Sequence, residues 1–138
     1  MKNFERINVA LGERSYKIII GSQLLNKAGN FIKSATRSER VIIVTDENVA
    51  PLYLDTLANS IEISGISVDK IILPSGEQTK SISYFEKLTN NILGMKIDRN
   101  VALIALGGGV IGDLTGYVAS SILRGIGFVQ VPTTLLSQ

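Results

Sequence analysis

A strand, a glycine triplet and a helix follow one another between residues 101 and 124, and this order constrains the fold more than any other feature. Residues 101–106 are apolar without alternation, which is typical of a strand covered on both faces of a parallel sheet. Gly107, Gly108 and Gly109 then permit a sharp turn and a close approach of the backbone to a ligand. Because a helix starting there points unpaired N–H groups into the turn, the segment predicts a phosphate site.

The helix after the triplet carries a second pattern. Gly112, Gly116 and Ser120 recur every four residues and predict one helix face of minimal side chains, packed closely against a neighbour. Asp113 is expected in the first turn, where the helix dipole favours a carboxylate. A purely structural turn with a first-turn acid remains the alternative, because the triplet is not the G-x-G-x-x-G dinucleotide fingerprint.

Apolar runs and helical patterns alternate along the rest of the chain. Runs at 41–45, 70–73, 101–106 and 128–131 begin roughly 30 residues apart, the spacing of β-α-β units. Helical patterns at 23–33, 51–60 and 81–93 lie before and between them, and Ser22 is a candidate cap for the first. We therefore predict a single α/β domain over 1–138, with a Rossmann-like, open, mostly parallel sheet and helices on both faces. Two short β-rich runs, 4–10 and 16–20, predict an N-terminal hairpin at the sheet edge.

The segments that follow the four strands should meet, because the carboxyl ends of parallel strands share one edge of the sheet. A dinucleotide would find the groups it needs there: a glycine turn for the pyrophosphate and carboxylates for ribose hydroxyls. Asp46 and Glu77 are candidates for the adenosine ribose, and Asp113 for the second ribose or the nicotinamide end. A carboxylate beside the 2′ position favours NAD over NADP, a preference that Lys80 softens. The candidate cofactor-binding residues are Asp46, Asn48, Ser75, Gly76, Glu77, Gln78, Thr79, Lys80, Gly108, Gly109, Val110, Ile111, Gly112, Asp113, Thr133 and Thr134.

Each of these segments also has a structural interpretation. Asp46 and Asn48 could cap the following helix, and Thr133 with Thr134 could cap a helix that begins near the end of the sequence. Gly76-Glu77 could be an ordinary turn, and Lys80 a solvated lysine. Arg124 with Gly125 reads either as a helix end or as a contact for an anionic substrate.

The amino-acid composition argues against several classes of site and partner. The chain has no cysteine and no histidine, so a disulfide, a thiolate, a zinc site or a histidine-based triad contained in these residues is improbable. Its 14 basic and 12 acidic residues form no run of like charge, so we expect no nucleic-acid partner. Five glycines and Asp113 within the apolar stretch 101–123 argue against a membrane span. The charged N-terminal segment predicts no secretory signal, and hence a cytoplasmic location.

Three motifs together resemble one family. PSGEQTKS at 74–81, GGGVIGDLTGYVASSILRGI at 107–126 and FVQVPTTLLSQ at 128–138 resemble the N-terminal domain of the 3-dehydroquinate synthase family, which belongs to the sugar phosphate cyclases. The resemblance covers essentially the whole chain, and the three motifs stand in the family's order.

This resemblance implies an NAD- and metal-dependent enzyme of the shikimate pathway for aromatic amino acid biosynthesis. The reaction is the conversion of 3-deoxy-D-arabino-heptulosonate 7-phosphate to 3-dehydroquinate and phosphate, with zinc or cobalt as the metal and a homodimer as the assembly. The family's NAD contacts fall on the candidate residues above, and its substrate-contacting arginine falls on Arg124. The family's metal ligands, a glutamate and two histidines, match nothing here, so no catalytic or metal-binding residue is assigned to this chain.

The missing ligands suggest a truncated chain, or an excised NAD-binding domain without the helical domain that binds metal and substrate. We expect such a domain to fold and to bind NAD weakly without turnover. Three alternatives remain open: another sugar phosphate cyclase such as 2-deoxy-scyllo-inosose synthase, an iron-dependent alcohol dehydrogenase, and a non-catalytic nucleotide-binding module.

Overall fold

The fold is a four-stranded parallel sheet between two pairs of helices, with a separate two-stranded hairpin. The computed structural model describes residues 4–138. The sheet has the order β4-β3-β5-β6, and all three of its strand pairs are parallel. The strands are β3 (Arg40–Asp46), β4 (Ser67–Leu73), β5 (Ala102–Gly107) and β6 (Gly127–Pro132), each within a few residues of its predicted run.

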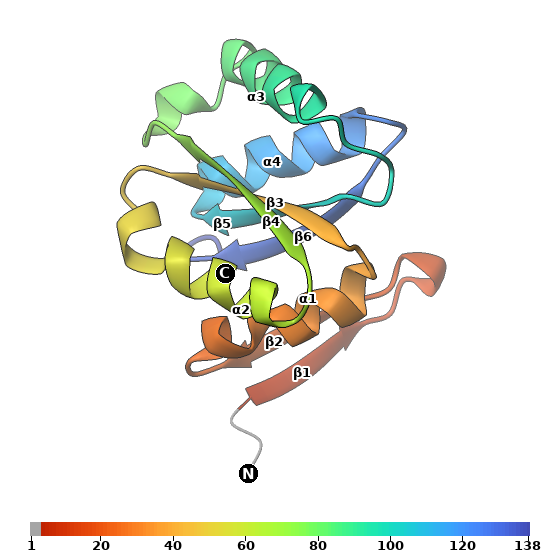
Figure 1. Cartoon of the computed structure of the whole chain (residues 1–138). Coiled ribbons are helices and arrows are strands. Elements are labelled where there is room, and N and C mark those ends of the chain that lie inside the picture. The colour runs from red at the N-terminus through yellow and green to blue at the C-terminus, as the bar shows by residue number, and fades with distance from the viewer. Residues whose placement is uncertain (1–3) are drawn as a thin grey trace.

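The sheet is covered on both faces, as predicted (Figure 1). Helices α1 (Ala28–Thr36) and α2 (Asp55–Ile63) cover one face, and α3 (Ile82–Gly94) and α4 (Gly109–Ser121) cover the other. Side chains of the central strands alternate between the two cores: Ile42 and Leu103 pack toward α3 and α4, whereas Ile43 and Ile104 pack toward α1 and α2. All four side chains are fully buried, so the uninterrupted apolar runs mark the strands that have helices on both sides.

The small-residue face of α4 packs against β6. A Cβ added to Gly116 would lie 3.0 Å from the ring of Phe128, and one added to Gly112 would lie 4.0 Å from the side-chain carboxamide of Gln130. The predicted close packing is therefore present at Gly116, whereas Gly112 makes an ordinary van der Waals contact and Ser120, the third residue of the pattern, is exposed. A tighter approach, which no sequence pattern indicated, occurs where Gly29 of α1 meets α2: a Cβ there would overlap the carbonyl of Ser60.

The starts of two helices differ from the prediction. The pattern at 23–33 begins with a 3₁₀ turn, η2 (Leu24–Lys27), and Ser22 does not cap it because Gln23, in a left-handed conformation, occupies the N-cap position. The pattern at 51–60 begins with a π-helical turn, η3 (Ala50–Leu54), before α2. By contrast, α3 starts as expected, with the Ser81 hydroxyl accepting a hydrogen bond from the amide of Tyr84.

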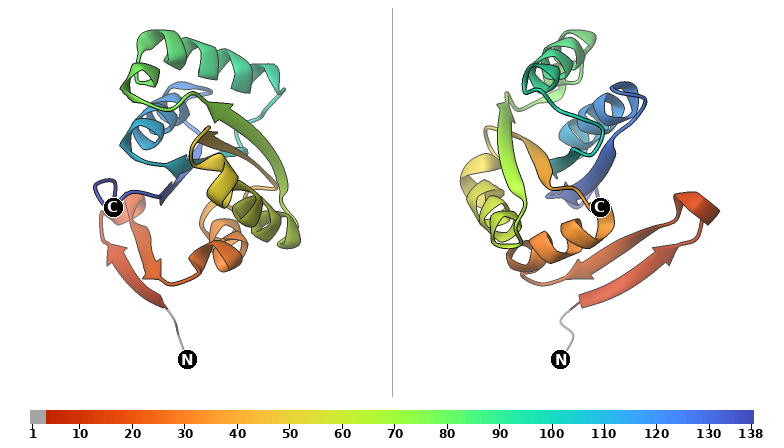
Figure 2. Two further views of the ribbon diagram at one scale, coloured as in Figure 1. Left: turned by 90° about the vertical axis from the view of Figure 1, so that its left-hand side faces the viewer. Right: turned by 45° about the vertical axis from the view of Figure 1, so that its right-hand side comes forward.

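The N-terminal hairpin is present, but it is not an edge of the main sheet. Among the residues that the structure describes, strands β1 (Phe4–Val9) and β2 (Tyr16–Gly21), joined by the 3₁₀ turn η1 (Gly12–Arg14), pair only with each other. The ring of Phe4 packs edge-on against Phe31 of α1, with 5.1 Å between centroids. The hairpin therefore docks on a helix through aromatic side chains instead of pairing its backbone with the sheet, and it projects beyond α1 (Figure 2).

Candidate functional site

The carboxyl ends of the four parallel strands lie side by side, as the sequence predicted. Asp46 at the end of β3 pairs in register with Leu73 of β4, and Gly107 at the end of β5 pairs with Pro132 of β6. The chain leaves β3 toward α2 on one face and β5 toward α4 on the other, so the strand order reverses between these two central strands. Ligands of open α/β sheets bind in the crevice at such a point.

The three consecutive glycines have different roles. None of them has a positive φ, so space and not backbone conformation explains the triplet. A Cβ on Gly107 would lie 2.9 Å from Ile111, and one on Gly108 would lie 3.1 Å from the methyl group of Thr134. A Cβ on Gly109 would meet nothing within 4 Å. The first two glycines therefore permit internal packing, while the third leaves open space beside the helix start.

The amides at that helix start are available to a ligand. Helix α4 begins at Gly109, and the amide of Gly112 donates to the carbonyl of Gly108 at 3.0 Å. The preceding amides, those of Gly109, Val110 and Ile111, have no carbonyl one turn back within the helix. A phosphate beside Gly109 would accept hydrogen bonds from these groups and lie at the positive end of the helix dipole.

Asp113 lies one turn further into α4 than predicted. The helix starts at Gly109, so Asp113 is outside the first turn and away from the unpaired amides. Its Oδ2 accepts a 2.7 Å hydrogen bond from Nζ of Lys80, an ion pair that links the loop after β4 to α4. The hydrogen bond and the negative charge of Asp113, with a smaller effect of Glu77, raise the pKa of Lys80 above its ordinary value. Lys80 is thus paired in this structure and not merely solvated.

The carboxylates at this edge have distinct partners. Asp46 accepts hydrogen bonds through Oδ1 from the amides of Asn48 and Val49, both at 2.9 Å, and so closes the turn before η3. The N-cap residue of η3 is Val49 without a side-chain bond, so neither Asp46 nor Asn48 caps the next helix. Glu47, which was not a candidate, accepts from the amide and the hydroxyl of Ser75 in the neighbouring loop. Within residues 4–138 the exposed Glu77 carboxylate accepts no hydrogen bond, so its oxygens are available for ribose hydroxyls.

The loop after β4 is held from inside. Thr79 is fully buried, and its hydroxyl donates to the carbonyl of Pro74 at 2.7 Å. Gly76 has a φ of +106°, which explains why a glycine is needed there. The side chain of Gln78 donates to the carbonyl of Ser75. These contacts shape the loop and leave the 3₁₀ turn η4 (Glu77–Thr79) with Glu77 facing solvent.

The segment after β6 closes the site beside the glycine turn. The amide of Thr133 donates to the carbonyl of Gly107 at 3.0 Å, while its buried Oγ1 has no hydrogen-bond partner among the described residues. Residues 134–137 form a turn in which Oγ1 of Thr134 accepts from the amide of Ser137 at 3.2 Å, the same bond that an N-cap residue makes. Thr133 therefore offers a polar group that a bound ligand could satisfy.

Arg124 lies away from this group. It follows the far end of α4, where Leu123, Arg124 and Gly125 all have positive φ, and it precedes β6 at the amino edge of the sheet. A 13-residue helix spans roughly 20 Å, which separates Arg124 from Gly109 in the same chain. Its predicted contact with substrate stays a prediction, and the structure does not bring it together with the coenzyme candidates.

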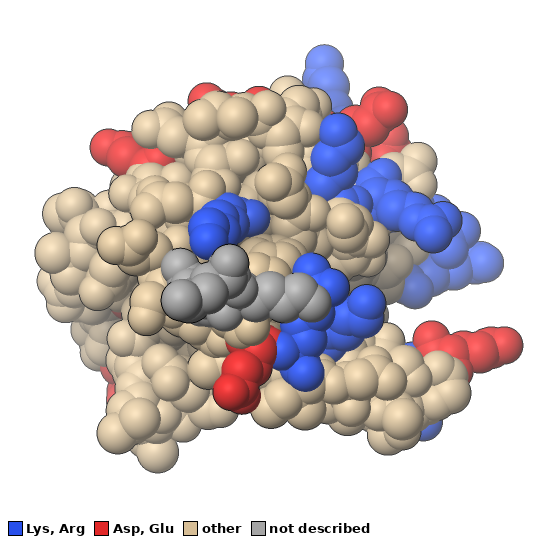
Figure 3. All heavy atoms as spheres, turned by 90° about the horizontal axis from the view of Figure 1, so that it is seen from below, with Lys and Arg blue, Asp and Glu red and all other residues tan. Residues whose placement is uncertain are grey.

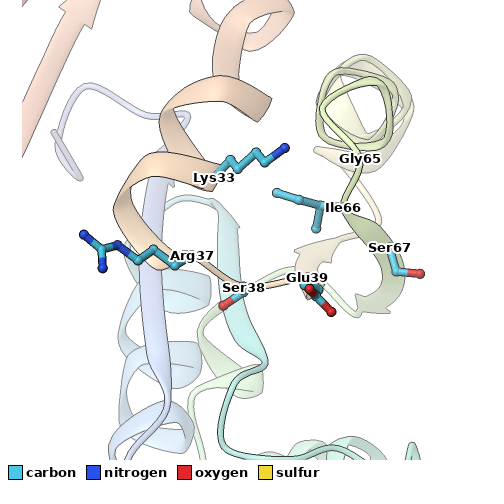
Figure 4. A pocket seen from close by; sticks show the side chains of 7 residues that line it. All are labelled: Lys33, Arg37, Ser38, Glu39, Gly65, Ile66 and Ser67. Carbon is cyan, nitrogen blue, oxygen red and sulfur yellow. The ribbon is translucent and has the colours of Figure 1, made fainter.

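A cavity is also present at the amino edge. It has a volume of about 570 Å³ and lies between the end of α1 and the loop before β4. Within it Lys33 points toward Gly65 and Ile66, and its Nζ donates to the carbonyl of Ser64, whereas Arg37 points away (Figure 4). Its polar side chains do not converge, so we do not assign a site to it.

Two further classes of site receive no support from the described residues. Across residues 4–138 no group of three or more acidic, histidine or cysteine side chains is placed to hold a metal ion. In the same part of the chain no helix combines the length and the apolarity needed to cross a bilayer.

Comparison with known proteins decides the family. The model of the 3-dehydroquinate synthase N-terminal domain matches residues 70–138, the half of the chain that carries the three motifs. The chain belongs to this family. A 3-dehydroquinate synthase from Rhizobium etli is 48% identical over 134 residues, which is 97% of this chain. The chain spans only 36% of the length of that relative.

Solved structures agree on the fold. A 2-deoxy-scyllo-inosose synthase complexed with carbaglucose-6-phosphate, NAD⁺ and Co²⁺ superposes with a TM-score of 0.86 and 23% identity, over 96% of this chain and 36% of the other. A 2-epi-5-epi-valiolone synthase from Streptomyces hygroscopicus, with NAD⁺ and Zn²⁺ bound, gives 0.74 and 26% over 93% of this chain and 35% of the other. The R. etli 3-dehydroquinate synthase is twice as similar in sequence as the 2-deoxy-scyllo-inosose synthase. The alternative of a 2-deoxy-scyllo-inosose synthase is therefore less favoured.

Proposed function

We propose that this chain is the NAD-binding domain of a 3-dehydroquinate synthase. The single observation that carries the proposal is the open space at Gly109 beside the unpaired amides of α4, at the strand-order reversal. The free carboxylate of Glu77 and the unpartnered Oγ1 of Thr133 border the same edge. A backbone phosphate site, a ribose acceptor and an unsatisfied hydroxyl are what a dinucleotide requires, so the residues present fit NAD.

Different residues would bind different parts of the coenzyme. The amides of Gly109, Val110 and Ile111 would hold the pyrophosphate, Glu77 the adenosine ribose, and Lys80 with Asp113 the nicotinamide half. NAD would supply a hydride acceptor that is regenerated within one turnover. Glu77 would repel the 2′-phosphate of NADP, which is why we propose NAD as the coenzyme. The two cyclase structures with bound NAD⁺ support this choice.

The activity belongs to the whole protein. We propose conversion of 3-deoxy-D-arabino-heptulosonate 7-phosphate to 3-dehydroquinate and phosphate, in the cytoplasm, by a homodimer that needs neither a nucleic acid nor a membrane. The chain has no histidine, so a divalent zinc or cobalt ion would be held by residues outside these 138. Arg124 would bind the anionic substrate. We expect the 138 residues alone to be inactive.

Calorimetric titration of the 138-residue chain tests the coenzyme assignment. We expect saturable binding of NAD, and binding of NADP weaker by at least about tenfold, which corresponds to 1.4 kcal/mol. Absence of NAD binding, or equal affinity for the two coenzymes, would contradict the proposal. Formation of 3-dehydroquinate by this chain without added protein would contradict the proposal that the 138 residues alone are inactive.

A further inference from the structure

The loops after β3 and β4 are joined by one side chain, that of Glu47. Its Oε1 lies 3.3 Å from both the amide nitrogen and the hydroxyl oxygen of Ser75, and both groups are placed to donate to it. The backbone supports the same junction, because the amide of Glu47 donates to the carbonyl of Leu73 at 3.0 Å. Glu47 thus holds the first residues of the loop that carries Glu77.

The other carboxylates at this edge cannot do the same. Asp46 has one oxygen engaged by the turn amides of Asn48 and Val49, and it stabilises its own loop. The Glu77 side chain extends into solvent from η4 and bonds to nothing among the described residues. The three acids therefore differ in role: Asp46 closes a turn, Glu47 bridges two loops, and Glu77 is a free acceptor.

The Glu47 bridge holds the loop after β4 at the end that leaves the strand. Its far end is anchored by the buried Thr79, whose hydroxyl donates to Pro74, and by the ion pair of Lys80 with Asp113. Between these anchors and β4 the backbone turns at Gly76, whose φ of +106° is one that few residues other than glycine adopt. Ser75 is the residue before that turn, so a bond to its amide sets where the turn that carries Glu77 begins.

We propose that Glu47 is a positioning residue for the adenosine half of the coenzyme. It acts through Ser75 and Gly76 to hold the Glu77 carboxylate where it can accept ribose hydroxyls, and it makes no contact with the coenzyme itself. This inference rests on the proposed function, since it assigns Glu77 to the adenosine ribose. The bonding requires an oxygen acceptor at position 47, not a negative charge.

Two substitutions separate the acceptor from the charge. Glu47→Gln keeps a carbonyl oxygen and removes the charge, whereas Glu47→Ala removes both. Glu62→Ala, on the exposed surface of α2, is the matched control. Each variant of the 138-residue chain is titrated with NAD, with AMP as a probe of the adenosine half, and with nicotinamide mononucleotide as a probe of the other half. Amide hydrogen exchange at Ser75 is measured without ligand.

We expect Glu47→Ala to weaken NAD and AMP by the same factor, about fivefold for one lost positioning bond, and to leave nicotinamide mononucleotide unchanged. Glu47→Gln should stay within about twofold of the unsubstituted chain. Exchange at the Ser75 amide should accelerate in the alanine variant alone, while thermal stability hardly changes because Glu47 is exposed.

Two results would overturn the inference. One is an alanine variant that binds NAD normally. The other is a glutamine variant as weak as the alanine variant, which would mean that the charge acts on the ligand directly. If the unsubstituted chain bound no NAD, the proposed function would fail instead, and the Ser75 exchange rate would still show whether the bridge exists.

Discussion

The two edges of the same sheet differ in charge: acidic side chains predominate at the carboxyl edge, where Lys80 is the exception, and basic ones predominate at the amino edge, where Glu39 and Asp98 are exceptions. At the carboxyl edge, Asp46 and Glu47 lie at the end of β3, Glu77 follows β4, and the start of α4 after β5 offers backbone amides. At the amino edge, where the helices end, Arg37, Lys96 and Arg124 precede β3, β5 and β6. Basic side chains also gather along one side of the face seen from below (Figure 3).

The helix dipole explains this difference. Helices that return antiparallel to the strands bring positive N-terminal ends to the carboxyl edge and negative C-terminal ends to the amino edge. Basic residues at the amino edge therefore stabilise helix ends, and a phosphate at the carboxyl edge needs no lysine or arginine in its first contacts. Neither the basic residues nor the cavity beside Lys33, which lies at the amino edge, marks the candidate site.

The largest expected effect comes from filling the open space at the carboxyl edge. We expect Gly109→Val to lower NAD affinity by at least about tenfold, because the branched side chain would occupy the place of the pyrophosphate. Folding should be spared, since an added Cβ meets nothing within 4 Å. Calorimetry and thermal denaturation of the same sample measure both effects. Normal NAD binding by this variant would contradict the assignment of the pyrophosphate to the carboxyl edge.

An intermediate effect is expected from changing the backbone at the amino edge. Arg37 has a φ of 55° at the end of α1, a conformation that glycine adopts without steric cost. We expect Arg37→Gly to change the free energy of unfolding by less than about 1 kcal/mol, because relief of strain is offset by loss of the cation at the helix end. Denaturant titration measures this free energy of unfolding for both chains. A change in NAD affinity would show that the amino edge takes part in coenzyme binding.

The smallest effect concerns the ion pair that crosses the carboxyl edge. Because Asp113 raises the pKa of Lys80, the stabilisation from this pair is present at neutral pH and is lost as the pH rises through that raised pKa. We expect Asp113→Asn to lower the pKa of Lys80 toward its ordinary value. NMR titration of the lysine side chain follows this directly. An unchanged pKa would mean that the pair does not persist in solution.

Much of the architecture could be predicted because single segments encode it. The apolar runs of β3 and β5 are buried on both faces, and Ser81 caps α3 through its own hydroxyl. The hairpin was predicted from its two β-rich runs, but its place was not, because the Phe4–Phe31 contact joins residues that no local pattern relates. The same limit hid the contact of Gly29 with Ser60.

The candidate site could likewise be predicted only in part from the sequence. The motifs after each strand, with parallel topology, were sufficient to predict that Asp46, Glu77, Gly109 and Thr133 share an edge. They could not predict which carboxylate is free: Asp46 and Glu77 were equal candidates for ribose, and Glu47 was not considered. The starting residue of α4 was also uncertain, so Asp113 was placed one turn too early.

The amino-acid sequence by itself determined the order of strands and helices, the glycine turn and the family, because periodicity and motifs are properties of contiguous residues. Only the tertiary structure decided which glycine faces open space, which acid bridges two loops, and that Lys80 pairs with Asp113. These depend on distances between segments about 30 residues apart, and such distances are set by how helices pack on a twisted sheet.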